Sequence, residues 1–572
     1  MQAKLFHGLK LGLIGLTLGL SAPLAQADGI AGPYLAANQA DLRNDYAAAA
    51  DYYDKALAVR PGNVGLLNNA VVVNVIAGRQ AHAQELAERL KMLQGSNQVM
   101  ALTRLAEALR AENYELALSY ATNPEFRLNP LMSALVHGWA QVGLGEFAEA
   151  VTVFEGLQGN AALQAYGSLH HALALALAGD FASAAEILDG DEEGPLHLNR
   201  LAMLTHIVSL SQSERMDEAL ALAEDILRGS RTDPEVEAMV ATLSAGEPLE
   251  FTQITTAAQG AASVFSILAG ALTREQAERL GLVYARLATH IRPSYDEVTT
   301  LIGDVLTDQG QFDLAAEAFE EVAATSAWYV TAEVGRADAL SSADRVDEAI
   351  EVLSNLARVK PDNMSVITAL GDMMRREDNF SGAAEVYDQA INLIDVATPS
   401  DWRLFYVRGI AHERTDQWPK AEADFRRALE LNPDQPHVLN YLGYSMVELH
   451  QNLEEALDMI ERAVAQRPND GYITDSLGWV LYRLGRYEEA VAPMERAVEL
   501  LPVDPILNDH LGDVLWKVGR QNEAVFQWKR ALSFEPEDED LERIRRKLEV
   551  GLDVVLAEEA EGEAPAETAL GD

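Results

Sequence analysis

Residues 471–536 read GYITDSLGWVLYRLGRYEEAVAPMERAVELLPVDPILNDHLGDVLWKVGRQNEAVFQWKRALSFEP, and this stretch contains one pattern twice. The second copy begins at Pro505 and has, at positions 7, 8, 20, 24, 27 and 32, Leu511, Gly512, Ala524, Trp528, Ala531 and Pro536. The first copy begins at Gly471 and has, at the same positions, Leu477, Gly478, Ala490, Met494, Ala497 and Pro502. A fixed period of 34 residues predicts a solenoid of stacked, similar units.

The pattern extends over most of the chain. With small insertions, the earlier units begin at Pro436, Trp402, Met364, Val330, Asp296 and Ala262, and a more diverged series begins at Ile30, Val64, Gln98, Leu131, Ala165 and Arg200. Position 20 is alanine in all of these units except one, which has Gly281. We expect each unit to be two antiparallel helices that cross closely where a small residue at position 8 meets the small residue at position 20. Proline near position 32 then ends the second helix, because it lacks the amide hydrogen.

These residues resemble the tetratricopeptide repeat (TPR), and the resemblance covers most of the chain. It implies an all-α, right-handed superhelical solenoid of about 14 helix-turn-helix repeats. The runs GWVLYRLGRYEEAV and NDHLGDVLWKVGR also resemble proteobacterial cell-envelope and periplasmic TPR scaffold proteins, which include a lipoprotein adaptor for a carboxyl-terminal processing protease. Since this chain has no cysteine to carry a lipid, the resemblance does not extend to the membrane anchor.

The sequence predicts six segments. They are a signal peptide (1–27), a degenerate TPR array (28–233), a junction (234–261), a second TPR array (262–538), a capping helix (539–556) and a disordered acidic tail (557–572). The junction is expected to break the register of the repeats, with one unpaired helix near residues 253–259. The basic residues of the capping helix, Arg543, Arg545, Arg546 and Lys547, are expected to pair with the acidic run 535–542.

The first 27 residues have the composition of an export signal. Lys4 and Lys10 precede a short apolar run, and Ala25 and Ala27 form a small-x-small exit, which predicts cleavage after Ala27 and a periplasmic protein. The alternative is an N-terminal membrane anchor, although the apolar run is short for a bilayer. No later segment has eighteen uninterrupted apolar residues, so no membrane-spanning segment is expected after cleavage.

Composition and motifs argue against catalysis and against nucleic acid as a partner. The 572 residues carry 44 Lys and Arg against 89 Asp and Glu, a formal charge of −45 that repels a phosphate backbone. We find no phosphate loop, dinucleotide fingerprint, nucleophile elbow or HExxH motif, and the adjacent His170 and His171 point to different helix faces. The sequence therefore predicts no enzyme activity, cofactor or metal, with an unrecognised catalytic site as the remaining alternative.

The resemblance assigns partner binding to a concave groove lined by positions 2, 5, 9, 12 and 13 of each first helix. From Trp402 onward these positions hold aromatic, basic and acidic residues, namely Arg403, Tyr406, Arg414, His437, Asn440, Tyr444, Tyr472, Asp475, Trp479, Tyr482, Arg483, Asp509, Asp513, Trp516 and Lys517. Aromatic rings beside arginines are typical of binding hot spots. In the units before them the same surface is acidic, with Thr300, Asp304, Asp308, Asp338 and Asp372.

Three functional interpretations stay open. A non-catalytic scaffold or adaptor would bind protein or peptide partners, such as a partly extended peptide with apolar and basic residues, and an envelope protease is one candidate partner. A polysaccharide-binding subunit of an exopolysaccharide export or assembly system would stack sugars on the same rings. The third interpretation is an enzyme with an unrecognised catalytic site. The structural alternative to a binding groove is that several of these rings simply pack between neighbouring first helices.

Overall fold

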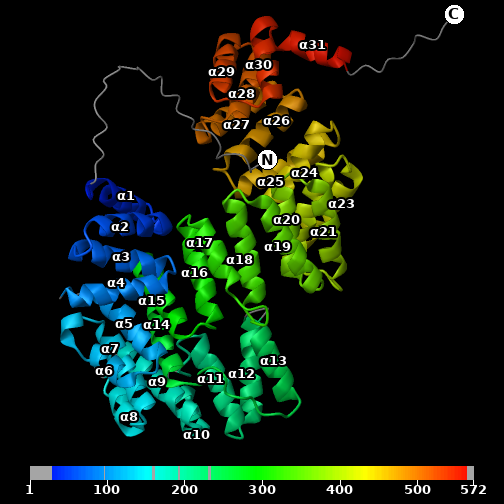
Figure 1. The fold of residues 1–572 in the computed structure, drawn as a ribbon. Helices are drawn as coiled ribbons and strands as arrows, with labels where there is room; N and C mark the ends of the chain where they lie inside the picture. Colours follow the sequence, from blue (N-terminus) through cyan, green and yellow to red (C-terminus); the bar gives the residue numbers. More distant parts are fainter. Residues whose placement is uncertain are drawn as a thin grey trace, which may run out of the picture. The chain divides into compact units, whose positions relative to one another are not determined.

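The computed structural model describes residues 29–93, 95, 97–157, 161–190, 194–229 and 233–562. This part of the chain contains 31 α-helices, two short 3₁₀ helices and no β-strand (Figure 1). The helices form two compact units, within residues 1–359 and 360–572. Both units are solenoids of antiparallel helix pairs, so the all-α repeat fold is confirmed.

The helices of unit 1 are α1 (Ala31–Leu42), α2 (Tyr46–Val59), α3 (Val64–Ile76), α4 (Gln80–Met92), α5 (Gln98–Arg110), α6 (Tyr114–Ala121), α7 (Pro130–Leu144), α8 (Phe147–Glu155), α9 (Ala161–Ala178), α10 (Phe181–Asp189), α11 (Arg200–Gln212), α12 (Met216–Gly229), α13 (Pro234–Ser244), α14 (Ala257–Arg274), α15 (Glu278–Ile291), α16 (Asp296–Asp308), α17 (Phe312–Glu320), α18 (Tyr329–Ser342) and α19 (Val346–Val359).

The helices of unit 2 are α20 (Met364–Arg376), α21 (Phe380–Asn392), α22 (Trp402–Glu413), α23 (Trp418–Leu431), α24 (Pro436–Glu448), α25 (Leu453–Gln466), α26 (Gly471–Arg483), α27 (Tyr487–Leu500), α28 (Pro505–Lys517), α29 (Gln521–Ser533), α30 (Asp538–Val550) and α31 (Leu552–Gly562).

The predicted repeat register is that of the structure. Nine first helices begin at the predicted residue: α3, α5, α11, α16, α20, α22, α24, α26 and α28. The largest differences are at α9 and α14, which begin four and five residues earlier than predicted. Every position-20 residue is buried, from Ala49 to Ala524, and the single glycine, Gly281, is buried as well.

The contact at position 8 differs from the prediction. A Cβ atom added to Gly138, Gly371 or Gly512 would lie 2.2, 2.5 or 2.3 Å from the side chains of Phe154, Tyr387 and Trp528, respectively. These large residues occupy position 24, one helical turn after the small residue at position 20. Position 8 is therefore small chiefly because it receives the bulky side chain of position 24. The predicted contact with position 20 is present in the repeat from Pro436, where a Cβ added to Gly443 would lie 3.1 Å from the Ala456 carbonyl oxygen.

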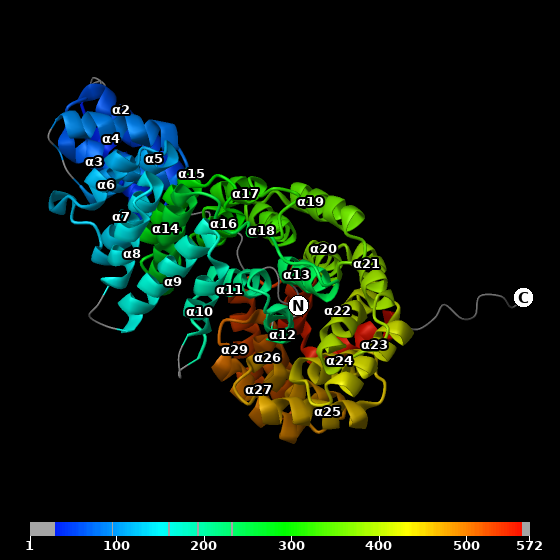
Figure 2. The ribbon, with the colours of Figure 1, turned by 90° about the horizontal axis from the view of Figure 1, so that it is seen from below.

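In unit 1 the helix pair α14–α15 packs against the first helices of the N-terminal repeats. Helix α14 contacts α5, α7 and α9, and α15 contacts α3 and α5 (Figures 1 and 2). Gly260 in α14 lies so close to α7 that an added Cβ would be 2.4 Å from the Trp139 indole. The N-terminal helices α3, α5, α7 and α9 are thus covered on one side by their own second helices and on the other by α14–α15.

Polar contacts secure this packing at several points. Arg279 in α15 pairs with Asp41, at 3.0 Å for one nitrogen–oxygen pair, and the Arg286 Nε donates to the Ile76 carbonyl at 3.2 Å. His290 Nε2 lies 2.7 Å from Glu107 Oε2. Trp139 Nε1 donates to His170 Nδ1 at 2.9 Å, and both side chains are fully buried. Burial lowers the pKa of His170 to about 3.

The segments between and after the repeats differ from their predicted limits. In the junction the additional helix is α13, which packs on α12, whereas residues 257–261 already belong to α14. The predicted capping segment consists of two helices, α30 and α31, and α31 continues to Gly562, into the segment expected to be disordered. The predicted signal peptide and residues 563–572 of the predicted tail lie outside the described residues.

Candidate binding surface on the inner face of unit 2

In unit 2 the first and second helices of each repeat lie on opposite sides of an arc. Figure 2 shows α20, α22, α24 and α26 on its inner side and α21, α23, α25 and α27 on its outer side. We define the inner face as positions 2, 5, 9, 12 and 13 of α22, α24, α26 and α28. The predicted binding residues lie on these four helices, and the structure shows how accessible each of them is.

The α22 part of the inner face is open. Arg403 and Arg414 are exposed, and the Arg414 guanidinium lies 4.7 Å from the centre of the Phe380 ring. Between them, Tyr406 is half-buried, with its ring centre 6.0 Å from that of Tyr441 in an edge-to-face arrangement. A fixed ring between two exposed cations can contact an apolar group and an anionic or carbonyl group of one ligand at the same time.

The α24 part is half-buried. His437, Asn440 and Tyr444 are all partly accessible, and the side-chain oxygen of Asn440 is buried without a hydrogen-bond partner within the described protein. Burial, reinforced by Glu448, raises the pKa of Tyr444, so this phenol is a hydrogen-bond donor at neutral pH. Helix α24 therefore offers both donor and acceptor groups next to an aromatic ring.

The α26 part is mostly closed. Trp479 stacks on Tyr482 with ring centres 4.8 Å apart and on His510 at 3.9 Å, and the Trp479 indole donates to Glu448 Oε1 at 2.7 Å. Asp475 is buried and its Oδ2 lies 2.9 Å from His510 Nδ1. For these side chains the packing interpretation is correct. Only two predicted residues of α26 stay half-buried at the edges of this stack: Tyr472 and Arg483.

The pKa of His510 reflects this environment. Burial by itself would lower the pKa, but the neighbouring carboxylate of Asp475, followed by those of Asp509 and Asp513, outweighs the burial and raises it. The raised pKa favours the cationic form of His510 relative to a free histidine, and the ring lies against the Trp479 indole, where a cation and a π-system attract each other.

The α28 part is occupied by the C-terminal helices of the same chain. Asp509 and Asp513 are buried because they bind the fully buried ammonium group of Lys547 in α30. Trp516 and Lys517 both donate to Asp553 in α31. These acidic positions are therefore not open to a partner while α30–α31 are docked.

The predicted pairing of the capping helix is confirmed for Arg545, which pairs with the acidic run through Glu542 at 2.8 Å. Arg543 and Arg546 instead pair with Glu559 and Glu558 of α31. Consecutive helical residues point in different directions, so one helix can hold α28 and α31 simultaneously.

Sequence reasoning missed three contributors to this surface: Tyr441, Glu448 and His510. Tyr441 donates to Glu413 at 3.2 Å beside Tyr406, while Glu448 and His510 contact the Trp479 ring system. They stand at positions 6, 13 and 6 of their units, and only Glu448 occupies one of the positions that define the inner face. Each of the three lies one helical turn from a predicted residue of its own helix, and this spacing was the signal available in the sequence.

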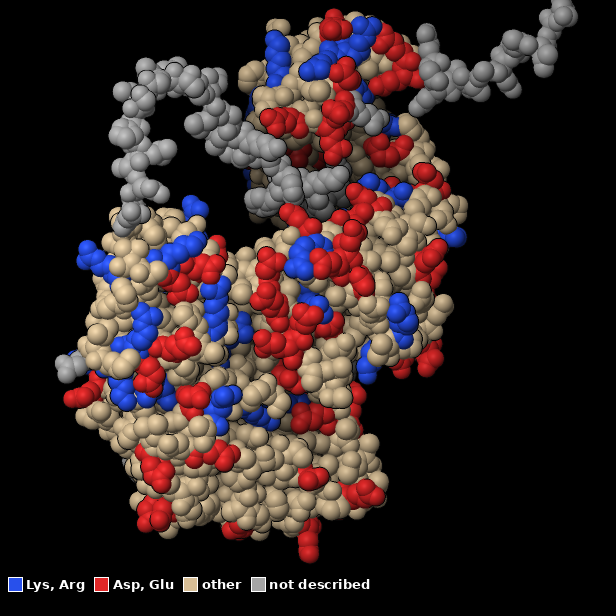
Figure 3. Space-filling model, viewed as in Figure 1, with Lys and Arg blue, Asp and Glu red and all other residues tan. Residues whose placement is uncertain are grey.

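The acidic series lies in a different environment. Within unit 1, burial and the neighbouring Asp308 raise the pKa of Asp304, whereas Thr300 donates to the Asp296 carbonyl and is buried. Asp338 also belongs to unit 1, and in unit 2 Asp372 accepts a hydrogen bond from Tyr387 at 2.7 Å. Figure 3 shows acidic side chains gathered over α17 and α18.

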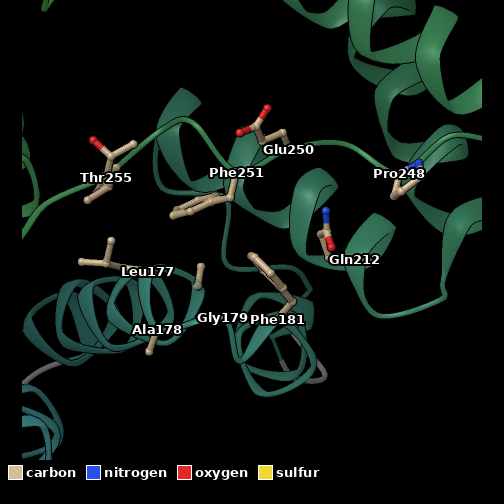
Figure 4. Close-up of a pocket in the computed structure, with 11 residues that line it drawn as sticks. Leu177, Ala178, Gly179, Phe181, Gln212, Pro248, Glu250, Phe251 and Thr255 are labelled. Atoms are coloured by element: carbon tan, nitrogen blue, oxygen red, sulfur yellow. The ribbon is translucent and has the colours of Figure 1, made fainter.

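A separate cavity of about 530 Å³ opens in unit 1 between the α9–α10 turn and the segment after α13 (Figure 4). Its lining includes Leu177, Phe181, Gln212 and Phe251, with the two phenylalanine rings edge to face and 6.0 Å apart. The sequence analysis had interpreted this segment only as a junction. The cavity is shallow, and its polar Gln212 amide already donates to the Leu249 carbonyl.

Comparison with known proteins agrees with the geometry. Tetratricopeptide-repeat family models match residues 306–371, 402–435 and 443–505. The chain is a tetratricopeptide-repeat protein. It is 28% identical over 159 residues to the TPR repeat-containing protein PA4667 of Pseudomonas aeruginosa, a match that spans 28% of this chain and about a quarter, 26%, of that relative.

Similar solved structures are also repeat proteins. The Cut9–Hcn1 complex structure matches 92% of this chain and 97% of its own, with 14% identity and a TM-score of 0.38, and yeast Tom70 matches 94% and 97%, with 14% and 0.34. YrrB, described as a TPR protein with an unusual peptide-binding site, covers 34% of this chain and 99% of its own, with 18% and 0.28. Within the described ranges, no helix combines the length and apolar character needed to cross a membrane.

Proposed function

We propose that this protein is a non-catalytic scaffold or adaptor that binds a protein or peptide partner through the inner face of unit 2. The observation that carries the proposal is the contrast within that face. Around α22 and α24, Arg403, Tyr406, Arg414 and Tyr444 stay accessible, whereas most of the corresponding side chains of α26 and α28 pack against other parts of the chain. Repeat solenoids present such extended surfaces to other macromolecules.

The proposed ligand is an extended segment with apolar and polar side chains. Tyr406 and Tyr444 would cover its apolar side chains, and the exposed arginines would bind its carbonyl or carboxylate groups. Asn440 supports a polar contact between them, because its buried side-chain oxygen lacks a donor. Polysaccharide binding would use the same rings, so the experiment must separate the two.

We further propose that the protein acts in the bacterial cell envelope, in the periplasm. The support is the composition of residues 1–27, with its basic start, apolar run and Ala25-Gln26-Ala27 exit. Amino-terminal sequencing of the protein from a periplasmic fraction should give Asp28 as the first residue. An uncleaved chain that stays in the cytoplasmic fraction would refute this location.

Site-specific photo-crosslinking tests the binding proposal. A photoreactive phenylalanine analogue at Tyr406 or Tyr444 should crosslink to a discrete protein in cells that express the full chain. The matched control is the same analogue at Phe526, an aromatic side chain that is 61% exposed on the second helix α29 and away from the inner face. A protein partner predicts crosslinks from the first two positions only.

Arginine variants sharpen the same test. Arg403→Glu together with Arg414→Glu should abolish the crosslink from Tyr406 while leaving thermal unfolding nearly unchanged, since both side chains are exposed. Equal crosslinks from all three positions, or none from the inner face, would contradict protein binding there. Tyr406-dependent retention of oligosaccharides instead would favour the polysaccharide alternative.

A further inference from the structure

We propose that the inner face of the last repeat is a lysine-recognition site, which the chain's own helices α30–α31 occupy. A partner helix with Arg and Lys four residues apart would displace them. The identity of a partner rests on the proposed function, but the existence of the site does not. The structure itself contains the ligand group, the ammonium of Lys547.

The site is built by two carboxylates one helical turn apart. Lys547 Nζ lies 2.9 and 2.7 Å from the two oxygens of Asp509, and 2.7 and 2.8 Å from those of Asp513. Trp528 Nε1 donates to Asp513 Oδ1 at 3.0 Å and fixes that carboxylate. The Arg543 guanidinium lies 3.6 Å from both aspartates. All three members of the Lys547 cluster are buried.

The arrangement favours a bound cation. Burial and the adjacent Asp513 raise the pKa of Asp509, while Lys547 acts in the opposite direction. Two carboxylates this close and this buried cannot both stay ionised without a positive charge between them. The Trp528 ring, with its centre 5.9 Å from Nζ, adds a cation–π contact that a neutral ligand would not gain.

The occupying helices are held by ions together with a small apolar contact. Helix α30 reads DEDLERIRRKLEV and buries Ile544 fully, and α31 adds the buried Leu552 and Val555. Beside Lys547 and Arg543, α31 contributes Asp553, which accepts from Trp516 at 3.0 Å. By contrast α14, which fills the inner side of unit 1, buries an almost continuous apolar run from Ala257 to Phe265.

This difference makes α30–α31 easier to displace than α14. The solvent-exposed ion pairs, such as Lys517–Asp553, weaken with salt, and ion pairs can be exchanged for equivalent pairs, whereas a continuous apolar interface must be rebuilt as a whole. The chemistry of the competitor follows from the docked helices. It would be a helix with Arg and Lys at i and i+4, as Arg543 and Lys547 are, followed by a turn and an acidic residue, as Gly551 and Asp553 follow α30.

The test uses the full chain with Lys547→Glu, which places a third carboxylate in the site and releases the chain's own helix. The probe is a fluorescent peptide of residues 536–562 with the natural sequence. We expect it to bind the variant at least tenfold more tightly than it binds the unaltered chain. A peptide that carries Lys547→Gln should bind neither protein. The matched control is a full chain with Arg545→Glu, the same charge change at an exposed residue that pairs with Glu542. This chain should bind the natural peptide as weakly as the unaltered chain does.

Two results would overturn the proposal. The first is that a Lys547→Glu chain binds no peptide although its α26–α29 amides keep their protection from hydrogen exchange. The second is equal binding of the natural and Gln peptides. If Lys547→Glu unfolds α28–α29, hydrogen exchange of the unaltered chain tests the proposal instead. Salt should accelerate exchange in α30–α31 and not in α28–α29, and equal protection of the two pairs at every salt concentration would refute the proposal. Failure of the crosslinks at Tyr406 and Tyr444 would refute the proposed function and leave this site intact.

Discussion

The N-terminal repeats of unit 1 and the repeats of unit 2 share one architecture but differ in what covers their inner side. In unit 1 the pair α14–α15 lies against α3, α5, α7 and α9, so that those first helices are buried on both sides. In unit 2 the chain covers only the α26–α28 end, with α30–α31, and leaves α22 and α24 partly accessible. A repeat array thus offers a binding surface only where its own chain does not fill it.

The two arrays differ in the residues at the inner positions of their first helices. At position 9 the N-terminal units have Val72, Ala106, Trp139 and Leu173, whereas the later units from Pro436 onward have Tyr444, Trp479 and Asp513. Apolar inner positions lose free energy when they face water, and α14–α15 remove that cost. Polar and aromatic inner positions tolerate water and can exchange it for a partner.

The largest expected effect comes from truncating position 9 in the two units. Trp139→Ala should lower the free energy of unfolding by about 3–5 kcal/mol, because the indole is fully buried and packs against His170 and α14. Tyr444→Ala, at the same position in unit 2, should cost less than half as much because its ring is half-buried. Urea unfolding of both variants measures the two losses of unfolding free energy. Equal losses would contradict the proposed difference between the two units.

The two units should respond alike at position 20. Ala49→Leu in unit 1 and Ala490→Leu in unit 2 should each cost roughly 1–3 kcal/mol, since both alanines are fully buried where two helices cross and a larger side chain overpacks the crossing. Thermal unfolding measures the effect, with Ala492→Leu at an exposed position of the same helix as the control. Unchanged unfolding at both buried positions would contradict the register.

Two histidines should give the units opposite pH dependences. The native pKa of His170 is lowered to about 3, so its contribution to stability is present above about pH 6.5 and is lost as the pH falls toward 3. The native pKa of His510 is raised, so its contribution is present below about pH 6.5 and is lost as the pH rises through the native pKa.

Each histidine should change the free energy of unfolding by at most about 1.4 kcal/mol per pH unit within its window. Urea unfolding across pH 4–9, compared with His170→Gln and His510→Gln chains, isolates each contribution. His170→Gln should flatten the acidic side of the plot of unfolding free energy against pH, and His510→Gln should flatten its alkaline side. If both variants flatten the same side, the electrostatic assignment of one histidine is wrong.

The smallest effect on stability is expected on the open surface. Arg403→Ala should change the free energy of unfolding by less than about 0.5 kcal/mol, because the side chain is exposed, while reducing partner crosslinking from Tyr406. Arg427→Ala is a suitable control, since Arg427 lies on the outer helix α23 and pairs with Glu430. A matching loss of crosslinking in the control would show that general charge, and not the inner face, matters.

Much of the fold could be predicted because the repeat pattern acts locally. The small residue at position 20 and the proline near position 32 depend on contacts within one helix pair, so the 34-residue period locates both helices. The position-8 contact was predicted only in part, since sequence spacing gives the helix face but not which of two residues one turn apart is nearer. The starts of α9 and α14 were placed too late because their first turns lie outside the repeat pattern.

The candidate site was predictable only in part, since accessibility depends on distant segments. Arg403, Tyr406, Arg414 and Tyr444 share the inner face, as the spacing indicated. Trp479 and Tyr482 occupy equivalent positions but are buried, since they stack on each other and Trp479 also stacks on His510. Asp513 is buried by Lys547 from a helix two elements later. Nothing in the spacing of α26 or α28 distinguishes these residues from the accessible ones.

The sequence by itself determined the class of fold, the number and register of the helix pairs and the face on which we propose that a partner binds, because periodicity and small-residue positions encode contacts between neighbours in the chain. Only the tertiary structure decided which parts of that face are free. The packing of α14–α15 on the N-terminal repeats and the Lys547 contact join segments far apart in sequence. Such contacts depend on how the solenoid curves, which no local pattern records.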